Sequence, residues 1–374
     1  MTDHAAPNGA ASTPPHVRIS ELRPGMTIQS AYLVASVEQR TKKNGEPFFM
    51  LQLADVSGTI PAVMWDNHDS LVAGTVGVED FAVVTADVAE FKDAPQLTLR
   101  RIGTVDEALI DTRNFLAESP RPRAEMEAEL DALLARIRHP DVRRLMAKML
   151  GHPKLREAYC TAPAAARLHQ AYRGGLLEHT LIVVNHALNA APQYEPVNRD
   201  VLIAGALLHD VGKVREYSWR RTILYTDEGR LLGHVVMGAM MAEAAIRELQ
   251  REPEGFDDSL RRHILHLILS HHGKLEWGAP STPKTREALL LHYADQMDAF
   301  MVIATDDMKR AAVRGDEWTS YNRFFESYLF AGTPAPLEEA ERERFLVPPP
   351  GPLAPASGPA DDTGPTTKAA AGNP

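Results

Sequence analysis

Cysteine is nearly absent from this 374-residue sequence, and long apolar runs and an excess of positive charge are missing altogether. The single cysteine, Cys160, excludes an intramolecular disulfide framework and any zinc site built from thiolates. No stretch approaches the ~18 consecutive apolar residues that a membrane-spanning helix needs, and the first residues lack the order of a secretory signal. We therefore expect a cytoplasmic protein without a membrane partner.

The net charge of −10 argues against a protein that binds duplex DNA by neutralising many phosphates. It is compatible with a protein that grips a few nucleotides by stacking and through metal ions. Histidine, in contrast, is abundant, with 15 residues in the chain. Their positions direct the rest of the interpretation.

The pattern of strands and helices divides the chain into segments. Five strand-like stretches separated by turns predict a small closed barrel over residues 17–103, similar to an OB-fold of the kind that binds single-stranded nucleic acid. A helical linker over 104–162 and an all-α domain over 163–331, helical to about residue 330, are expected next. The ends, 1–16 and 332–374, are predicted to be disordered because they are poor in apolar periodicity. The predicted fold class is thus multidomain, a small β-barrel followed by an all-α domain.

The predicted barrel contains candidate contacts for a single strand. Phe48, Phe49 and Trp65 are candidates for stacking on bases, and Lys42 and Lys43 for binding phosphates. The alternative is that the aromatic side chains fill the barrel core and the lysines solvate a hairpin. The predicted barrel has 8 Lys and Arg against 11 Asp and Glu, which weakens the case for nucleic-acid binding.

The helical half of the sequence places imidazoles and carboxylates in apolar surroundings at five points. These are His179, the pair His209-Asp210, His234, the pair His271-His272, and Asp295. Imidazole and carboxylate are the ligands that divalent metals use when no thiolate is available. A buried, unpaired aspartate costs several kcal/mol, so the apolar context of His209-Asp210 favours a metal site.

Two resemblances follow from these residues. The run His209-Asp210-Val211-Gly212-Lys213, with His179 before it and Asp295 after it, resembles the signature of the HD-domain metal-dependent phosphohydrolases. With a barrel ahead of it, and with the runs at 173–179 and 270–273, the chain resembles the YhaM-type 3′–5′ exoribonucleases over about residues 17–330.

The resemblance implies roles for individual residues. The implied ligands of a first metal are His179, His209, Asp210 and Asp295; those of a second are Asp210, His234 and His271, with Asp210 bridging. His272 would be a ligand or a neighbour of one, and the sequence leaves both open. Lys213 and Asp210 would be catalytic, Arg173 and His169 would contact substrate, and Glu178 would orient His179.

The implied activity is a metal-dependent 3′–5′ exoribonuclease that acts on single-stranded RNA, and single-stranded DNA is a further candidate substrate. Two divalent ions are expected, manganese first, and the ligands also suit Fe, Co, Ni, Mg or Zn. An oligomer is compatible with the sequence. Two alternatives stay open: an HD-type hydrolase of nucleotides or cyclic dinucleotides, and a non-catalytic protein that binds single-stranded nucleic acid.

Overall fold

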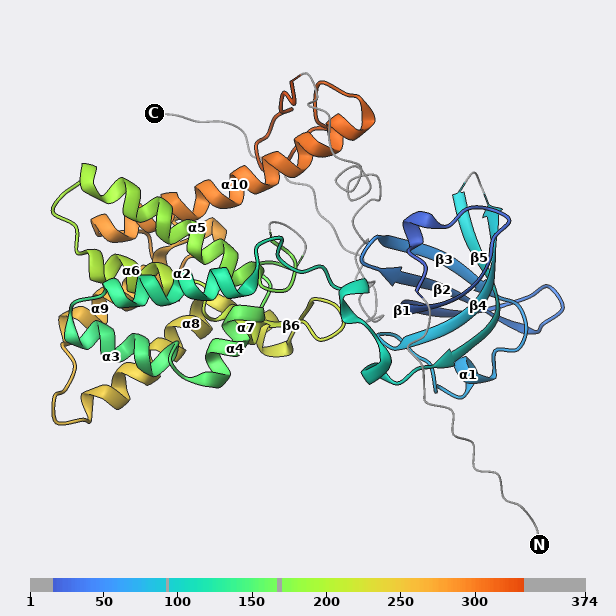
Figure 1. Cartoon of the computed structure of the whole chain (residues 1–374), viewed down its shortest axis with the longest axis horizontal. Coiled ribbons are helices and arrows are strands. Elements are labelled where there is room, and N and C mark those ends of the chain that lie inside the picture. The colour runs from blue at the N-terminus through green and yellow to red at the C-terminus, as the bar shows by residue number, and fades with distance from the viewer. Residues whose placement is uncertain (1–15, 92–93, 167–169, 333–374) are drawn as a thin grey trace, which may run out of the picture.

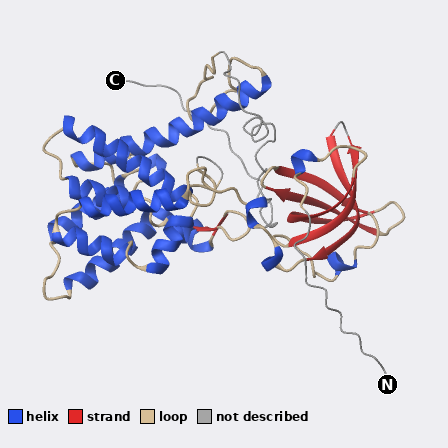
Figure 2. Cartoon of the chain, in the orientation of Figure 1, coloured by secondary structure: helices blue, strands red, loops and turns tan. Residues whose placement is uncertain are grey.

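The computed structural model describes residues 16–91, 94–166 and 170–332, which form a β-barrel followed by a helical domain (Figure 1). Strands gather in the N-terminal part and helices in the C-terminal part (Figure 2). The tails predicted to be disordered, 1–16 and 332–374, lie almost wholly outside the described residues. Within the described part of the chain, no helix combines the length and the hydropathy needed to cross a lipid bilayer.

Five strands close the barrel in the order β1-β2-β3-β5-β4, with β4 pairing back to β1. Their bounds are β1 (Thr27–Thr41), β2 (Pro47–Asp55), β3 (Gly58–Met64), β4 (Phe81–Phe91) and β5 (Ala94–Thr104). The β3–β5 pair is parallel and the other neighbours are antiparallel. A closed five-stranded barrel with this mixed pairing has the architecture of an OB-fold, and the predicted barrel is confirmed.

Side chains of β2 alternate between the barrel core and its surface, as the period of a strand requires. Phe49, Leu51 and Leu53 are buried in the core. Phe48 points the other way and stacks on Trp65, with ring centroids 4.7 Å apart and planes at 22°. The prediction that Phe49 stacks on a base is therefore wrong, because its ring is 4% exposed and fills the barrel interior.

The helical domain has one continuous apolar core, to which α2 to α6 and α8 to α10 all contribute. The main helices are α2 (Arg123–Arg136), α3 (Pro140–Met149), α4 (Pro153–Thr161), α5 (Gly175–Ala190), α6 (Arg199–Leu208), α7 (Lys213–Glu216), α8 (Asp227–Gln250), α9 (Asp258–Ser270) and α10 (Arg286–Arg314). Short helical turns are η1 (Ile19–Glu21), α1 (Asp69–Val72), η2 (Glu107–Leu109), η3 (Thr112–Asn114), η4 (Ala191–Gln193) and η5 (Leu275–Trp277). Helices α2 to α4, predicted as a linker, thus pack into the core of the domain that follows.

Two segments depart from the predicted helical pattern. The last helix ends at Arg314, because Gly315 adopts a left-handed conformation with φ 78° that closes α10. Residues 315–332 form an irregular arm with isolated bridges, so the prediction of helix to about residue 330 is wrong there. A short hairpin of β6 (Tyr217–Ser218) and β7 (Leu224–Tyr225) also interrupts the helices.

The hairpin ties the helical domain to the barrel through Arg221, which lies between its two strands. The Arg221 guanidinium donates to the Glu79 carbonyl at 2.6 Å and to Glu107 Oε2 at 2.8 Å. It also lies over the Phe81 ring, 5.3 Å from the centroid. The segment between α7 and α8 therefore contacts both domains.

Candidate active site

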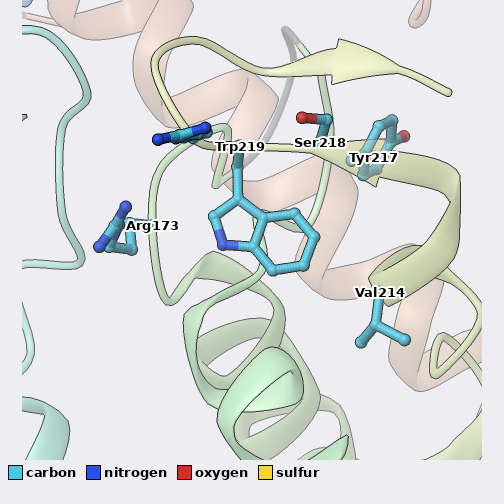
Figure 3. Close-up of a pocket in the computed structure, with 6 residues that line it drawn as sticks. Arg173, Val214, Tyr217, Ser218 and Trp219 are labelled. Atoms are coloured by element: carbon cyan, nitrogen blue, oxygen red, sulfur yellow. The ribbon is translucent and has the colours of Figure 1, made fainter. Parts of the chain in front are cut away.

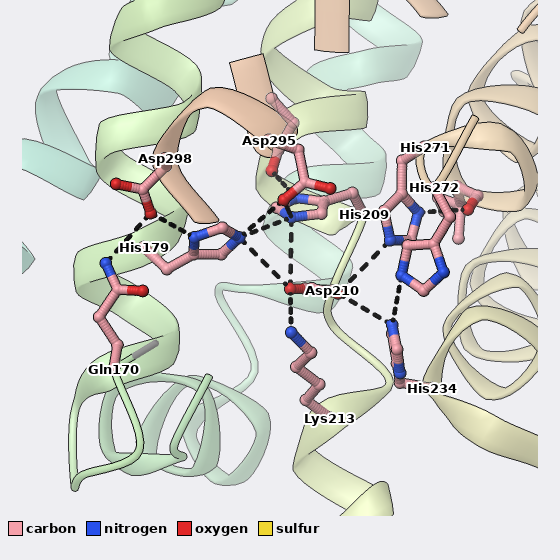
Figure 4. A network of polar contacts seen from close by, with 12 residues as sticks. Gln170, His179, His209, Asp210, Lys213, His234, His271, His272, Asp295 and Asp298 are labelled. Carbon is pink, nitrogen blue, oxygen red and sulfur yellow. Dashed lines mark hydrogen bonds and ion pairs between the residues drawn. The ribbon is translucent and has the colours of Figure 1, made fainter. Parts of the chain in front are cut away.

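Imidazoles and carboxylates from five helical segments meet inside the helical domain (Figure 4). His179 lies on α5, His209 closes α6, and Asp210 follows in the turn before α7. His234 lies on α8, the pair His271-His272 follows α9, and Asp295 lies on α10. The structure therefore brings together all seven residues predicted as ligands or as a neighbour of ligands.

A first group of ligand atoms surrounds His179 Nε2. This nitrogen lies 3.1 Å from Asp295 Oδ1, 3.3 Å from His209 Nε2 and 3.5 Å from Asp210 Oδ2. His179 and His209 have no exposed surface. Buried polar atoms this close require a shared partner or a network of protons between them.

A second group surrounds Asp210 Oδ1, the other oxygen of the same carboxylate. His234 Nε2 lies 3.3 Å and His271 Nε2 3.6 Å from it, and His234 Nε2 is 3.2 Å from His272 Nε2. Asp210 Oδ1 and His271 Nε2 are buried and have no hydrogen-bond partner among the residues that the structure describes. Asp210 thus presents one oxygen to each group, as the predicted bridging role requires.

The Nδ1 atoms of these histidines fix their tautomers. Nδ1 of His209, His271 and His272 each lies 2.7 Å from a backbone carbonyl oxygen, which can only accept a hydrogen bond. Nδ1 of His179 and His234 faces the carboxylates of Asp298 and Glu216, at 2.6 and 3.0 Å. In the neutral imidazole the proton therefore sits on Nδ1, and the lone pair of Nε2 points inward in all five rings.

With all five rings neutral, the inward lone pairs and the two carboxylates cannot hydrogen-bond to one another, because none of them is then a donor. A divalent cation is the partner that satisfies such a set, and carboxylate with imidazole suits Mn, Fe, Co, Ni or Zn. Asp210 Oδ1 and His271 Nε2, buried and unsatisfied among the described residues, are atoms that such a cation would bind. The residues present therefore fit a metal centre.

The pKa values of the site residues reflect their burial and the charges around them. Burial opposes a charged His179, but hydrogen bonds to Asp295 and Asp298 outweigh burial and raise its pKa to about 9. Burial would raise the pKa of Asp210, yet Lys213 and His209 hold it well below its usual range. Burial lowers the pKa of His272 to about 3, so that ring is neutral near pH 7. A metal ion would displace the Nε2 proton of His179, since ligands bind in their deprotonated form.

Two glycines allow the backbone to bring these side chains together. A Cβ on Gly212, just after Asp210, would lie 2.0 Å from the His234 carbonyl oxygen, so only glycine lets the turn approach α8 this closely. Gly233 has φ 71° and ψ 155°, which breaks α8 immediately before His234. The break frees the His234 N–H to donate to Glu216 Oε1 at 3.1 Å. The imidazole Nδ1 of His234 lies near the same oxygen, at 3.0 Å.

Lys213 reaches the same centre from the first turn of α7. Its Nζ donates to Asp210 Oδ2 at 2.5 Å, and the side chain is buried. A buried ammonium beside a bridging carboxylate balances charge there and remains close to any phosphate brought to the ligands. The predicted position of Lys213 beside the centre agrees with this geometry.

Two carboxylates that hold the histidines were not predicted as site residues. Asp298 lies one turn after Asp295 on the same face of α10, so a search for carboxylates at i+3 would have found it. Glu216 is three residues after Lys213 and carries no such signal. Glu178, predicted to orient His179, instead accepts from Ser119 Oγ at 2.6 Å and Tyr172 OH at 2.8 Å, so that prediction is wrong.

Replacing Asp298 with asparagine should weaken metal binding. Asn can present its amide nitrogen to His179 Nδ1 and no longer fixes the tautomer, and loss of such an outer carboxylate costs 10- to 100-fold in metal affinity. We expect the dissociation constant for Mn²⁺, measured by isothermal titration calorimetry, to rise by about that factor. Glu178→Gln is the matched control, a buried carboxylate next to His179 in the chain that accepts hydrogen bonds from Ser119 and Tyr172. An equal loss in both variants would contradict the role of Asp298.

The predicted substrate contacts are dispersed. Arg173 lines a cavity beside α7, described below, whereas His169 lies outside the described residues. On the barrel, Trp65 is 44% exposed and Lys43 is exposed, while Lys42 is paired with Asp66 at 2.9 Å. The stacked pair Phe48–Trp65 is an aromatic feature of the barrel surface that suits a base.

Comparison with known proteins agrees with this geometry. The HD domain family matches residues 176–299, which include every candidate ligand. The 3′-5′ exoribonuclease YhaM of Bacillus velezensis is 34% identical over 298 residues, covering 79% of this chain and 91% of the relative. YhaM of Bacillus subtilis is 35% identical over 297 residues, with the same coverage of both chains.

Among solved structures, the second OB-fold domain of replication protein A from Methanococcus maripaludis matches 25% of this chain and 97% of that chain. It is 22% identical, with a TM-score of 0.21. The relatives, in contrast, are matched over most of both chains. The chain belongs to the YhaM family of HD-domain proteins.

Proposed function

We propose that this protein is a metal-dependent 3′–5′ exoribonuclease that removes mononucleotides from single-stranded RNA. The observation that carries the proposal is the Asp210 carboxylate, which faces two groups of inward imidazole lone pairs inside an HD domain. The YhaM relatives, named as 3′-5′ exoribonucleases, favour RNA over free nucleotides as the substrate. Single-stranded DNA is a second substrate to test beside RNA.

We infer two divalent ions, manganese first, held by the two groups. His179, His209, Asp210 and Asp295 would hold one ion, and Asp210, His234, His271 and His272 the other. Paired divalent ions supply an activated water and neutralise the phosphate under attack. The neutral, carbonyl-bound His272 fits a ligand better than a proton donor, because its Nε2 carries only a lone pair.

The surrounding residues of the chain orient the ligands and the substrate. Asp298 and Glu216 hold His179 and His234 with Nε2 turned inward. The Lys213 ammonium would pair with a nonbridging phosphate oxygen and thereby stabilise charge that develops during attack. With these groups in place no nucleophilic side chain is needed, and Cys160 is buried in the apolar core.

A labelled-RNA product ladder tests the activity. Full-length protein with Mn²⁺ should shorten a 5′-labelled single-stranded RNA one nucleotide at a time, and a 3′-labelled RNA should release labelled mononucleotide at once. Turnover of free nucleotides or cyclic dinucleotides without RNA shortening would favour the nucleotide-hydrolase alternative. RNA binding without cleavage would favour the non-catalytic alternative.

Trp65→Ala should weaken binding of long RNA. Removing a base-stacking aromatic costs about 1–3 kcal/mol, which corresponds to a roughly 5- to 150-fold rise in KM for a 20-nucleotide RNA. A dinucleotide, too short to span from barrel to metal centre, serves as the control substrate and should be cleaved as before. Equal effects on both substrates would show that the Phe48–Trp65 pair is not a platform for the strand.

A further inference from the structure

A cavity of about 390 Å³ lies at α7, on the segment that joins the helical domain to the barrel (Figure 3). Its lining residues are Arg173, Val214, Tyr217, Ser218, Trp219 and Arg220. Cavities of this size are common sites for small ligands. Apart from Arg173, none of these residues was singled out from the sequence.

Most residues that line the cavity lie in the chain next to residues of the metal centre. Val214 follows Lys213, whose ammonium touches Asp210, and Glu216, which holds His234, precedes Tyr217. One short stretch, residues 210–220, thus carries the bridging carboxylate, the ammonium and most of the cavity wall. A group bound in the cavity would lie next to the catalytic centre.

The same stretch leads to the barrel. Arg221, directly after the last cavity residue, binds the Glu79 carbonyl and Glu107 and lies over Phe81. The cavity therefore lies at the junction between the two domains. An RNA strand that passes from barrel to metal centre would run beside this junction.

The side chains of the cavity suit a nucleotide. Trp219 packs one part of its indole against the helical core and stays half-buried, and Figure 3 shows the ring between Arg173 and Val214. No hydrogen bond or ion pair engages the Arg173 guanidinium among the described residues, although Glu157 lies within electrostatic range. Arg220 uses only Nε, toward Glu107 at 3.1 Å, and is largely exposed. An indole face and two available guanidinium groups match a base and its phosphate.

We propose that this junction cavity is a nucleotide-binding subsite, in which a base of the substrate stacks on Trp219 and its phosphate pairs with Arg173 and Arg220. The subsite rests on the proposed function and deepens it, since it holds the strand between the barrel and the metal centre. Its two arginines would bind RNA locally, although the net charge of the whole chain is negative.

Steady-state kinetics on the full-length protein with a 20-nucleotide single-stranded RNA give the first test. Trp219→Ala should raise KM about 10-fold or more and change kcat less than about threefold, and Trp219→Phe should restore most of the affinity because phenylalanine also stacks. Arg173→Ala should raise KM similarly and reduce the salt dependence of binding. Trp318→Ala, an exposed tryptophan on the arm after α10, is the matched control and should behave as wild type. Unchanged KM in Trp219→Ala would overturn the proposal.

Tryptophan fluorescence with AMP and EDTA tests the subsite without turnover. AMP should quench the wild-type protein and Trp318→Phe, and the quenching should fall by more than half in Trp219→Phe. Equal quenching in all three proteins would overturn the subsite. This readout is separate from the product ladder, so RNA that is not shortened refutes the proposed function, whereas quenching that does not depend on Trp219 refutes the subsite.

Discussion

Asp210→Ala should reduce hydrolysis of single-stranded RNA by at least about 10³-fold. Asp210 contacts both ligand groups, with Oδ2 3.3 Å from His209 Nε2 and Oδ1 3.3 Å from His234 Nε2. The substitution removes a ligand from both proposed metal positions and leaves the Lys213 ammonium without the carboxylate it pairs with. Loss of a single charge-stabilising donor already costs 10²- to 10³-fold, and this change removes more. Initial rates with Mn²⁺ and labelled RNA measure the effect.

The control for this variant is Asp131→Asn, a largely exposed carboxylate on α2 that pairs with Arg156. It should keep the wild-type rate. Circular dichroism should show that Asp210→Ala retains the helical and barrel content of the wild type. Folded Asp210→Ala with activity within tenfold of wild type would refute the role of this carboxylate.

Removal of divalent metal should abolish hydrolysis to a similar extent and also lower stability. A cation that binds the converging Nε2 atoms and carboxylates does so only in the folded chain, so metal binding stabilises the folded state. At a concentration 100 times the dissociation constant, one bound ion stabilises the fold by about 2.7 kcal/mol. Dialysis against EDTA should therefore lower the midpoint of thermal unfolding by several degrees, and Mn²⁺ should restore both stability and activity.

Binding of RNA should respond differently to metal removal. The Phe48–Trp65 pair contains no metal ligand, so gel-shift binding should persist in EDTA, weak and sensitive to salt.

Asp210→Ala should gain no thermal stability from Mn²⁺. A wild-type protein whose unfolding midpoint and rate are both unchanged by EDTA would contradict the proposed metal centre.

The barrel was predictable because its signals are local. Alternating apolar residues and the turns at 43–45 and 55–58 indicate where the strands lie. The error at Phe49 has a local cause as well: Phe48 and Phe49 are adjacent in a strand, so they face opposite sides, and only one can lie on the surface. The end of α10 at Gly315 follows from a left-handed cap that a single glycine makes possible.

The candidate metal ligands could be predicted from the sequence, but the carboxylates that orient the histidines could not. His209-Asp210 stands out because a buried aspartate beside an imidazole needs a reason, whereas Glu216 and Asp298 are ordinary acidic residues on helices. The i+3 spacing of Asp298 from Asp295 places both on one face of α10, but the contacts of Asp298 and Glu216 with the histidines depend on how α10 meets α5 and how α7 meets α8, which no spacing specifies. Glu178 shows the converse: a neighbour of a ligand in sequence points away from it in space, toward Ser119 and Tyr172.

Anomalous X-ray diffraction at the manganese edge, from crystals grown with Mn²⁺, tests the metal centre most directly. The account predicts two peaks on opposite sides of the Asp210 carboxylate, one among His179, His209 and Asp295, the other among His234, His271 and His272. Absence of both peaks, or manganese bound only elsewhere on the chain, would contradict it.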